Sequence, residues 1–122
     1  MNSKDYIYNY AEQTALTDEQ TAEKVKKLTV GDFNHLHAAL GIAGEAGEIV
    51  DVIKKHVIYG KREVGAELIE EMGDLFWYLA ILCRGYGIDF RQIMYTNIEK
   101  LKERYPDGKW TAEDALAKRD KQ

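Results

Sequence analysis

Cysteine and proline are almost missing from this sequence, which has one of each in 122 residues. A single thiol, Cys83, cannot form a disulfide within the chain, so the sequence does not belong to the small disulfide-stabilised secreted proteins. A reducing compartment suits such a chain, and we expect a cytoplasmic protein. Because Pro106 is the one proline, long stretches carry no residue that breaks a helix.

The sequence also has no long apolar run and no excess of basic residues. The longest run, Leu75–Cys83, is far too short to cross a bilayer, and the opening MNSKDYIYNY lacks the apolar segment of a secretory signal. Lysine and arginine number 17 against 21 acidic residues, a net charge of −4. Because nucleic-acid phosphates require a basic surface, we expect no nucleic-acid partner. The short apolar run likewise leads us to expect no membrane partner.

Strand-type alternation is absent as well, and the pattern predicts an all-α protein forming an antiparallel helical bundle. We expect a single domain over residues 1–122, with its core at about 33–106. Long helices are expected at 32–58, at 64–86, and from Asp89 to just before Pro106. Short helices are expected at 5–12, at 18–27 with Thr17 and Gln20 as a capping box, and at 112–118 after the cap Thr111.

Apolar residues at helical spacing predict the buried faces. The first long helix carries Leu36, Leu40, Ala43, Gly47 and Val50, and the second carries Leu68, Met72, Leu75, Leu79, Leu82 and Tyr86. Beyond Asp74 the second helix is apolar nearly all round, and such a helix is buried on every side. One short chain has too few other helices to cover it. We therefore expect oligomerisation to complete the bundle, as a homodimer or homotetramer.

Carboxylates recur three residues apart on both long helices. Glu45 and Glu48 share one face of the first helix, Glu71 and Asp74 share one face of the second, and Glu67 extends the second column. Two like charges about 4 Å apart repel by roughly 4 kcal/mol at an effective dielectric of 20. A single such pair is typical of a solvated helix face, but two pairs beside the core predict a site for Mg²⁺, with Mn²⁺ as a substitute.

A di-iron centre is the alternative within helical bundles. That centre requires Glu-x-x-His pairs, and no glutamate of this chain has a histidine three residues later. His35, His37 and His56 are interpreted as ordinary surface or half-buried residues. A site built only from oxygen ligands suits Mg²⁺ or Mn²⁺ better than iron or zinc.

Asn97, Lys100 and Arg104 fall on one face of the third long helix. Basic groups near an acidic metal site suit a polyphosphate, whose charge exceeds that of the metal. These three residues and Lys54, near the end of the first long helix, are the candidate substrate-binding residues. A solvated basic face, with Glu99 and Glu103 nearby, is the alternative for Lys100 and Arg104.

Together these residues resemble the MazG-like family of all-α nucleoside triphosphate pyrophosphohydrolases, over about residues 33–106. The family pattern is Glu-Glu-x-x-Glu, a spacer and Glu-x-x-Asp, and here it reads GEAGE at 44–48 and EMGD at 71–74. Gly44 stands where the first glutamate is often found. The segment NIEKLKERYPDG is similar to the family's third-helix ending. The resemblance implies Glu45, Glu48, Glu71 and Asp74 as Mg²⁺ ligands, with Asn97 and Lys100 contacting the nucleotide.

The chemistry implied by the resemblance is hydrolysis of a (deoxy)nucleoside triphosphate to the monophosphate and pyrophosphate, as in nucleotide-pool housekeeping. Glu48 and Glu70 are both candidate catalytic bases, and the sequence does not choose between them. The base and sugar preference stays open. A non-catalytic helical module, which oligomerises or binds nucleotide without turnover, is the alternative function.

Overall fold

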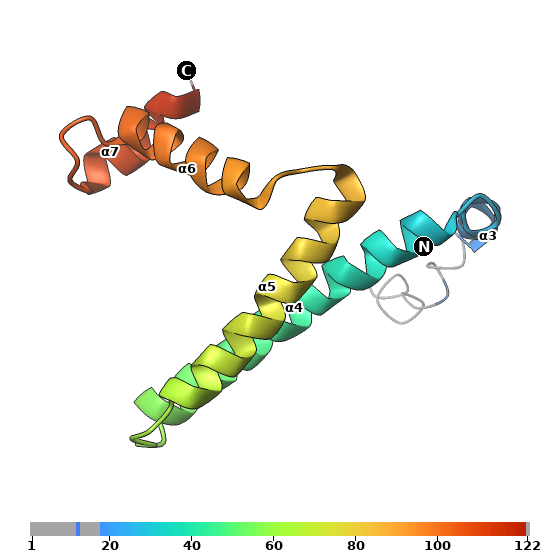
Figure 1. Ribbon diagram of the computed structural model, residues 1–122, viewed down its shortest axis with the longest axis horizontal. Coiled ribbons are helices and arrows are strands. Elements are labelled where there is room, and N and C mark those ends of the chain that lie inside the picture. The colour runs from blue at the N-terminus through green and yellow to red at the C-terminus, as the bar shows by residue number, and fades with distance from the viewer. Residues whose placement is uncertain (1–11, 13–17, 122) are drawn as a thin grey trace, which may run out of the picture. The chain divides into compact units, whose positions relative to one another are not determined.

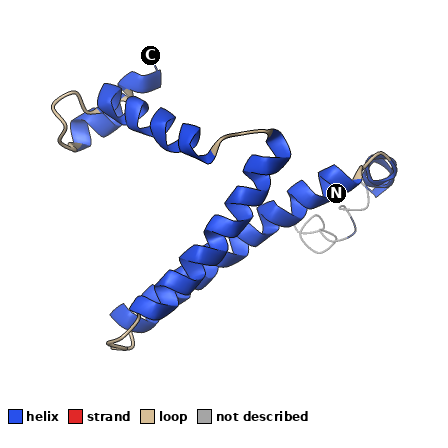
Figure 2. Cartoon of the chain, in the orientation of Figure 1, coloured by secondary structure: helices blue, strands red, loops and turns tan. Residues whose placement is uncertain are grey.

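The computed structural model describes residue 12 and residues 18–121, and its elements are helices joined by short turns. They are α3 (Asp18–Lys26), α4 (Val30–Val57), α5 (Gly65–Tyr86), α6 (Phe90–Arg104), α7 (Ala112–Ala117) and the 3₁₀ helix η2 (Arg119–Lys121) (Figure 1). The described residues contain no strand (Figure 2), which confirms the all-α prediction. Apart from Glu12, the expected helix at 5–12 lies outside the described residues, as does the cap Thr17.

The chain divides into two compact units, Met1–Leu36 and His37–Gln122. The first contains α3 and the beginning of α4. The second contains the remainder of α4, all later elements and every candidate site residue. Within the described residues, no helix is both long and apolar enough to cross a membrane.

The helix ends follow from local hydrogen bonds. Helix α4 begins two residues before the predicted Asp32, because Thr29 and Asp32 cap it reciprocally: each side chain accepts a hydrogen bond from the other's backbone N–H, at 3.1 and 2.9 Å. Helix α5 ends at Gly87, whose φ of 66° lies in the left-handed region, and the N–H of Ile88 donates to the carbonyl of Cys83 at 2.8 Å.

The later helices begin at the expected caps. The Asp89 carboxylate accepts from the N–H of Arg91 at 2.9 Å and starts α6. The hydroxyl of Thr111 accepts from the N–H of Asp114 at 3.0 Å and starts α7. Both caps follow the side-chain preference for helix N-termini and confirm the predicted starts.

In the second unit, α4 and α5 run antiparallel side by side as a helix hairpin (Figure 1). The side of α4 toward α5 is least exposed: Ala38 and Val52 are buried, and Ile42, Glu45 and Ile49 between them are half-buried. On α5 most of the half-buried residues follow the same three- and four-residue spacing; these are Glu67, Leu68, Glu71, Leu75, Tyr78, Leu79 and Leu82. We call this contact the hairpin seam.

The seam differs from the predicted core stripe of the first long helix. Leu40 and Val50 are 64% and 65% exposed in the single chain, so this stripe does not form the contact with α5. Helix α4 is apolar on two sides, and helical spacing alone does not indicate which side meets α5. The side with Leu40 and Val50 is free to pack against another element.

Candidate metal centre

Three carboxylates meet within the hairpin seam. Glu45 comes from α4, and Glu71 and Asp74 come from α5; one oxygen of each lies within 4.8 Å of the others. Glu45 and Glu71 are half-buried, and Asp74 is exposed. Three of the four predicted metal ligands therefore lie close together. Glu45 is 26 or more residues away from the other two in the sequence, and the hairpin brings it to them.

Helix geometry explains the convergence. Glu71 and Asp74 lie on adjacent turns of one face of α5, because three residues make nearly one turn. Glu45 lies on the α4 face that also carries the half-buried Ile42 and Ile49, so packing of those apolar residues against α5 directs its carboxylate into the seam. The acids are located by the same contacts that hold the two helices together.

The electrostatics of the group favour a cation. Partial burial is the main cause that raises the pKa of Glu71, followed by the negative charges of Glu48, Glu45, Glu70 and Asp74. A divalent ion at about 2.1 Å from its oxygens holds neighbouring ligands roughly 3 to 4 Å apart. The three oxygens, all within 4.8 Å of one another, need only a small adjustment to reach that spacing. The donor set, three carboxylates without nitrogen or sulfur, suits Mg²⁺ or Mn²⁺.

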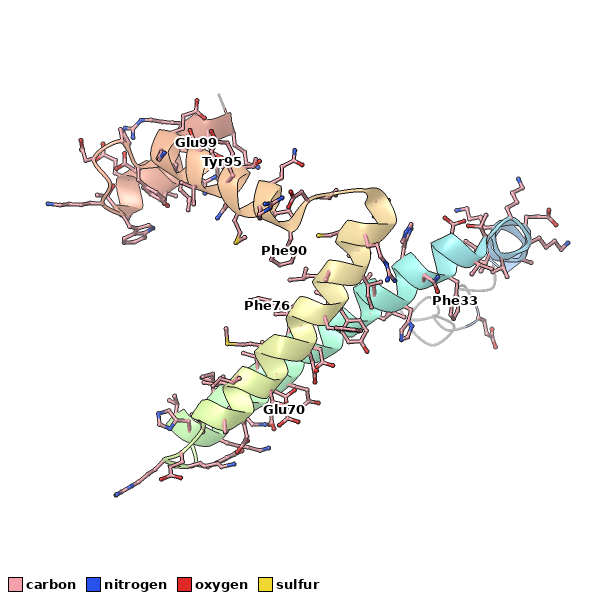
Figure 3. All side chains as sticks on the ribbon, viewed as in Figure 1. Phe33, Glu70, Phe76, Phe90, Tyr95 and Glu99 are labelled. Atoms are coloured by element: carbon pink, nitrogen blue, oxygen red, sulfur yellow. The ribbon has the colours of Figure 1, made fainter. Side chains whose placement is uncertain are left out.

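The remaining predicted acids lie around this group. Glu48 is exposed and stays outside the trio, although its charge acts on Glu71. Glu70 is also exposed and projects from α5 (Figure 3). Its charge, too, contributes to the raised pKa of Glu71. Both candidate bases are thus near the trio and open to solvent.

A basic cluster occupies the loop end of the hairpin. Asp51 accepts from Lys55 and Lys54, at 2.7 and 2.9 Å, and these contacts lower the pKa of Asp51 to about 2. Lys61 pairs with Glu67 across the turn. The predicted substrate residue Lys54 therefore has an acidic partner on its own helix. No site role was predicted for Asp51 or Lys55, although their spacings of three and four residues indicate these ion pairs.

On α6, Asn97 and Lys100 line one open groove of about 470 Å³. The other residues of this groove are Ile88, Gln92, Ile93 and Thr96. Amide, hydroxyl and ammonium groups therefore share an apolar floor, which suits a ligand with both a flat apolar part and a charged part. Asn97 and Lys100 therefore share one face of α6, as their spacing predicted.

Arg104 has a different environment from those two residues. Its Nε and Nη2 donate to Asp120 Oδ1 and Oδ2 at 2.6 and 2.8 Å, a two-point ion pair between α6 and η2. The Asp120 side chain is 2% exposed. Sequence spacing indicated the face of Arg104 but not Asp120, which lies 16 residues away in an element that had not been predicted.

Comparison with known proteins assigns these features to one family. Residues 33–109 match the MazG nucleotide pyrophosphohydrolase domain. The chain belongs to this family. The match covers most of α4 and all of α5 and α6, and it includes every candidate site residue described above.

Two relatives are similar to part of this chain. The Gene 37 protein of Mycobacterium phage L5 is 31% identical over 77 residues, which cover 59% of this chain and 67% of the phage protein. The uncharacterized protein YvdC of Bacillus subtilis (strain 168) is 36% identical over 70 residues, which cover 50% of this chain and 66% of YvdC. No solved structure matches significantly.

Proposed function

We propose that this MazG domain hydrolyses a (deoxy)nucleoside triphosphate with Mg²⁺, giving the nucleoside monophosphate and pyrophosphate, as a housekeeping enzyme of the cytoplasmic nucleotide pool. The observation that carries the proposal is the meeting of Glu45, Glu71 and Asp74 in the hairpin seam of a chain that belongs to a nucleotide pyrophosphohydrolase family. Water adds to the α-phosphorus, the bond to the bridging oxygen breaks, and one proton is released.

Glu45, Glu71 and Asp74 would hold the ion, with Glu48 as the fourth predicted ligand. When bound, Mg²⁺ supplies positive charge that neutralises the phosphate oxygens and the departing pyrophosphate. The protein's part is to concentrate negative charge in a half-buried seam. The raised pKa of Glu71 means that its charged form is unfavourable in the seam. A bound cation therefore stabilises this site more than it would stabilise a solvated acidic surface.

Proton removal from the attacking water falls to Glu48 or Glu70. Both are exposed carboxylates whose charges reach Glu71, so both lie near the trio without belonging to it. A base outside the trio keeps a lone pair available for a proton. Replacing each by glutamine separately distinguishes them. If Glu70 is the base, Glu70→Gln loses turnover but keeps Mn²⁺ binding, whereas Glu48→Gln, at the fourth predicted ligand, also weakens Mn²⁺ binding.

Asn97 and Lys100 are the proposed nucleotide contacts on α6, supported by the groove that they share. Lys54 is proposed to bind a phosphate of the substrate in place of Asp51, which is feasible because the ion pair is partly exposed and therefore weak. The Arg104 guanidinium is occupied by Asp120, so a substrate contact there requires the C-terminal segment to release it.

We propose in addition that the protein is a homodimer or homotetramer. Among the described apolar residues only Ala38, Val52 and Cys83 are buried. Phe76 and Trp77 on α5 are 53% and 68% exposed in the single chain. Soluble monomers rarely keep such large apolar surfaces, and a two-fold axis lets the same surface on each copy cover the other.

Product analysis tests the proposed reaction. Each common ribo- and deoxynucleoside triphosphate is incubated with the protein in Mg²⁺ and, as a control, in chelator. We expect at least one to give equal amounts of monophosphate and pyrophosphate in Mg²⁺ only. Orthophosphate as the sole primary product would contradict attack at the α-phosphorus, and nucleotide binding without turnover would favour the non-catalytic alternative.

A further inference from the structure

Gly41 of α4 lies against the ring of Tyr78 of α5, a close approach between the two helices of the hairpin. An ideal Cβ on Gly41 would lie 2.5 Å from Cδ1 and Cε1 of the Tyr78 ring and 2.6 Å from its Cγ. Real side chains do not tolerate such distances, so even alanine at this position requires the ring or the helix to move. The tyrosine ring lies directly on the backbone of α4.

The ring is held from a second side. The rings of His37 and Tyr78 meet edge to face, with centroids 6.0 Å apart and planes at 60°. His37 precedes Gly41 by one turn, so the two residues form adjacent parts of one α4 surface. Tyr78 is half-buried in the seam and is fixed between them.

This contact lies next to the metal centre on both helices. Glu45 follows Gly41 by four residues on α4, and Asp74 precedes Tyr78 by four residues on α5. Four residues rise about 6 Å along a helix. Because the helices are antiparallel, both steps lead from the Gly41–Tyr78 contact in the same direction, to the three carboxylates.

We propose that Gly41 and Tyr78 are positioning residues that set the distance between α4 and α5 at the metal centre. The inference rests on the proposed metal site. Neither residue contacts the ion. Because the flat ring of Tyr78 lies directly on the α4 backbone at Gly41, it fixes the distance between α4 and α5 at which Glu45 comes close to Glu71 and Asp74. A bulkier residue at position 41 would push the two helices apart at a point one turn from the carboxylates. The three carboxylates would then bind the ion more weakly.

The other glycines of α4 and α5 supply matched controls. A Cβ on Gly44 would meet no atom within 4 Å, although Gly44 is the neighbour of Glu45. Gly41→Ala and Gly44→Ala thus add the same methyl to the same helix, and both favour helix formation equally. They differ in whether the methyl meets Tyr78.

The experiment measures Mn²⁺ binding by titration without nucleotide, with circular dichroism and sedimentation as checks of helix content and oligomeric state. Wild type and Gly44→Ala should bind alike, and Gly41→Ala should bind about tenfold more weakly or worse. Tyr78→Phe should bind as wild type, because the ring and not the hydroxyl makes the contact. Tyr78→Leu should weaken binding, and Tyr78→Leu combined with Gly41→Ala should bind better than Gly41→Ala alone.

Equal Mn²⁺ affinity of Gly41→Ala and wild type would overturn the inference, as would an equal loss in Gly44→Ala. If Gly41→Ala does not fold, the comparison of Tyr78→Phe with Tyr78→Leu decides the question by the same criterion. Wild-type protein that binds no Mn²⁺ would overturn the metal site itself, and the two failures are thereby distinguished.

Discussion

Glu45 on α4 and Glu71 on α5 meet in the hairpin seam, where one carboxylate oxygen of each lies within 4.8 Å of the other. Burial and the surrounding acids raise the pKa of Glu71. The apo hairpin therefore carries a repulsion that is relieved either by a cation or by removal of one charge.

Replacing Glu45 or Glu71 by glutamine should change the stability of the metal-free protein and the turnover in opposite directions. Each change should raise the melting temperature of the metal-free protein, since it removes a repelling charge, and should abolish the further increase produced by Mg²⁺. Turnover should fall by about a thousandfold, equivalent to roughly 4 kcal/mol of lost charge stabilisation. Glu63→Gln, on the exposed hairpin turn, is the control and should change neither. Near-wild-type turnover of both ligand variants would refute the metal site.

The sequence predicted the helices and the acid pairs because both depend on local spacing. Glu71 and Asp74 share a face on any α-helix, and Asp89 and Thr111 cap helices through their nearest neighbours. Which side of α4 meets α5 depends instead on long-range packing. Leu40 and Val50 offered one apolar side and Ala38 and Val52 another, and only the structure shows that the second side forms the seam.

The ion-pair partner of Arg104 could not be predicted from the sequence for the same reason. The spacing of Asn97, Lys100 and Arg104 predicted one common role for them. Asp120, however, follows Arg104 by 16 residues, and the turn and α7 between them bring it back to Arg104. Contacts between elements distant in sequence depend on how those elements pack, and helical periodicity contains no information about that.

Asn97 and Lys100 should affect nucleotide binding more than metal binding. Loss of one hydrogen bond to a charged group costs about 1.5 to 3 kcal/mol, so Asn97→Ala and Lys100→Ala should each raise the KM for the preferred nucleotide about tenfold or more. Lys102→Ala is the matched control, because Lys102 is paired with Glu99 at 2.7 Å outside the Asn97 groove. Steady-state kinetics measures the effect. An equal increase of KM in Lys102→Ala would indicate a general charge effect.

Asp51 should make stability depend on pH at the acidic end. Its pKa is about 2 in the folded protein against 3.8 for an unperturbed aspartate, so the carboxylate stabilises the fold above pH 3.8. That contribution is lost as the pH falls through the interval between these values. The difference in urea midpoint between wild type and Asp51→Asn should be small, since the ion pairs are exposed, and should shrink steadily from about pH 4 toward pH 2. A constant difference over this interval would contradict the assignment.

The exposed apolar surface of α5 predicts self-association. Sedimentation at micromolar concentration should give a mass of at least twice the 14.0 kDa of one chain. Ala80→Asp places a charge on the surface that carries Phe76 and Trp77, and should dissociate or unfold the protein. Ala112→Asp, at the exposed start of α7, should do neither. A well-folded wild-type monomer would refute the proposed oligomer.

The central claim is that water attacks the α-phosphorus of a nucleoside triphosphate at the seam of Glu45, Glu71 and Asp74. Hydrolysis in ¹⁸O-labelled water with Mg²⁺, followed by mass spectrometry of both products, tests it most directly. The account predicts one ¹⁸O atom in the nucleoside monophosphate and none in the pyrophosphate. Label in the pyrophosphate, or label only in orthophosphate, would contradict it.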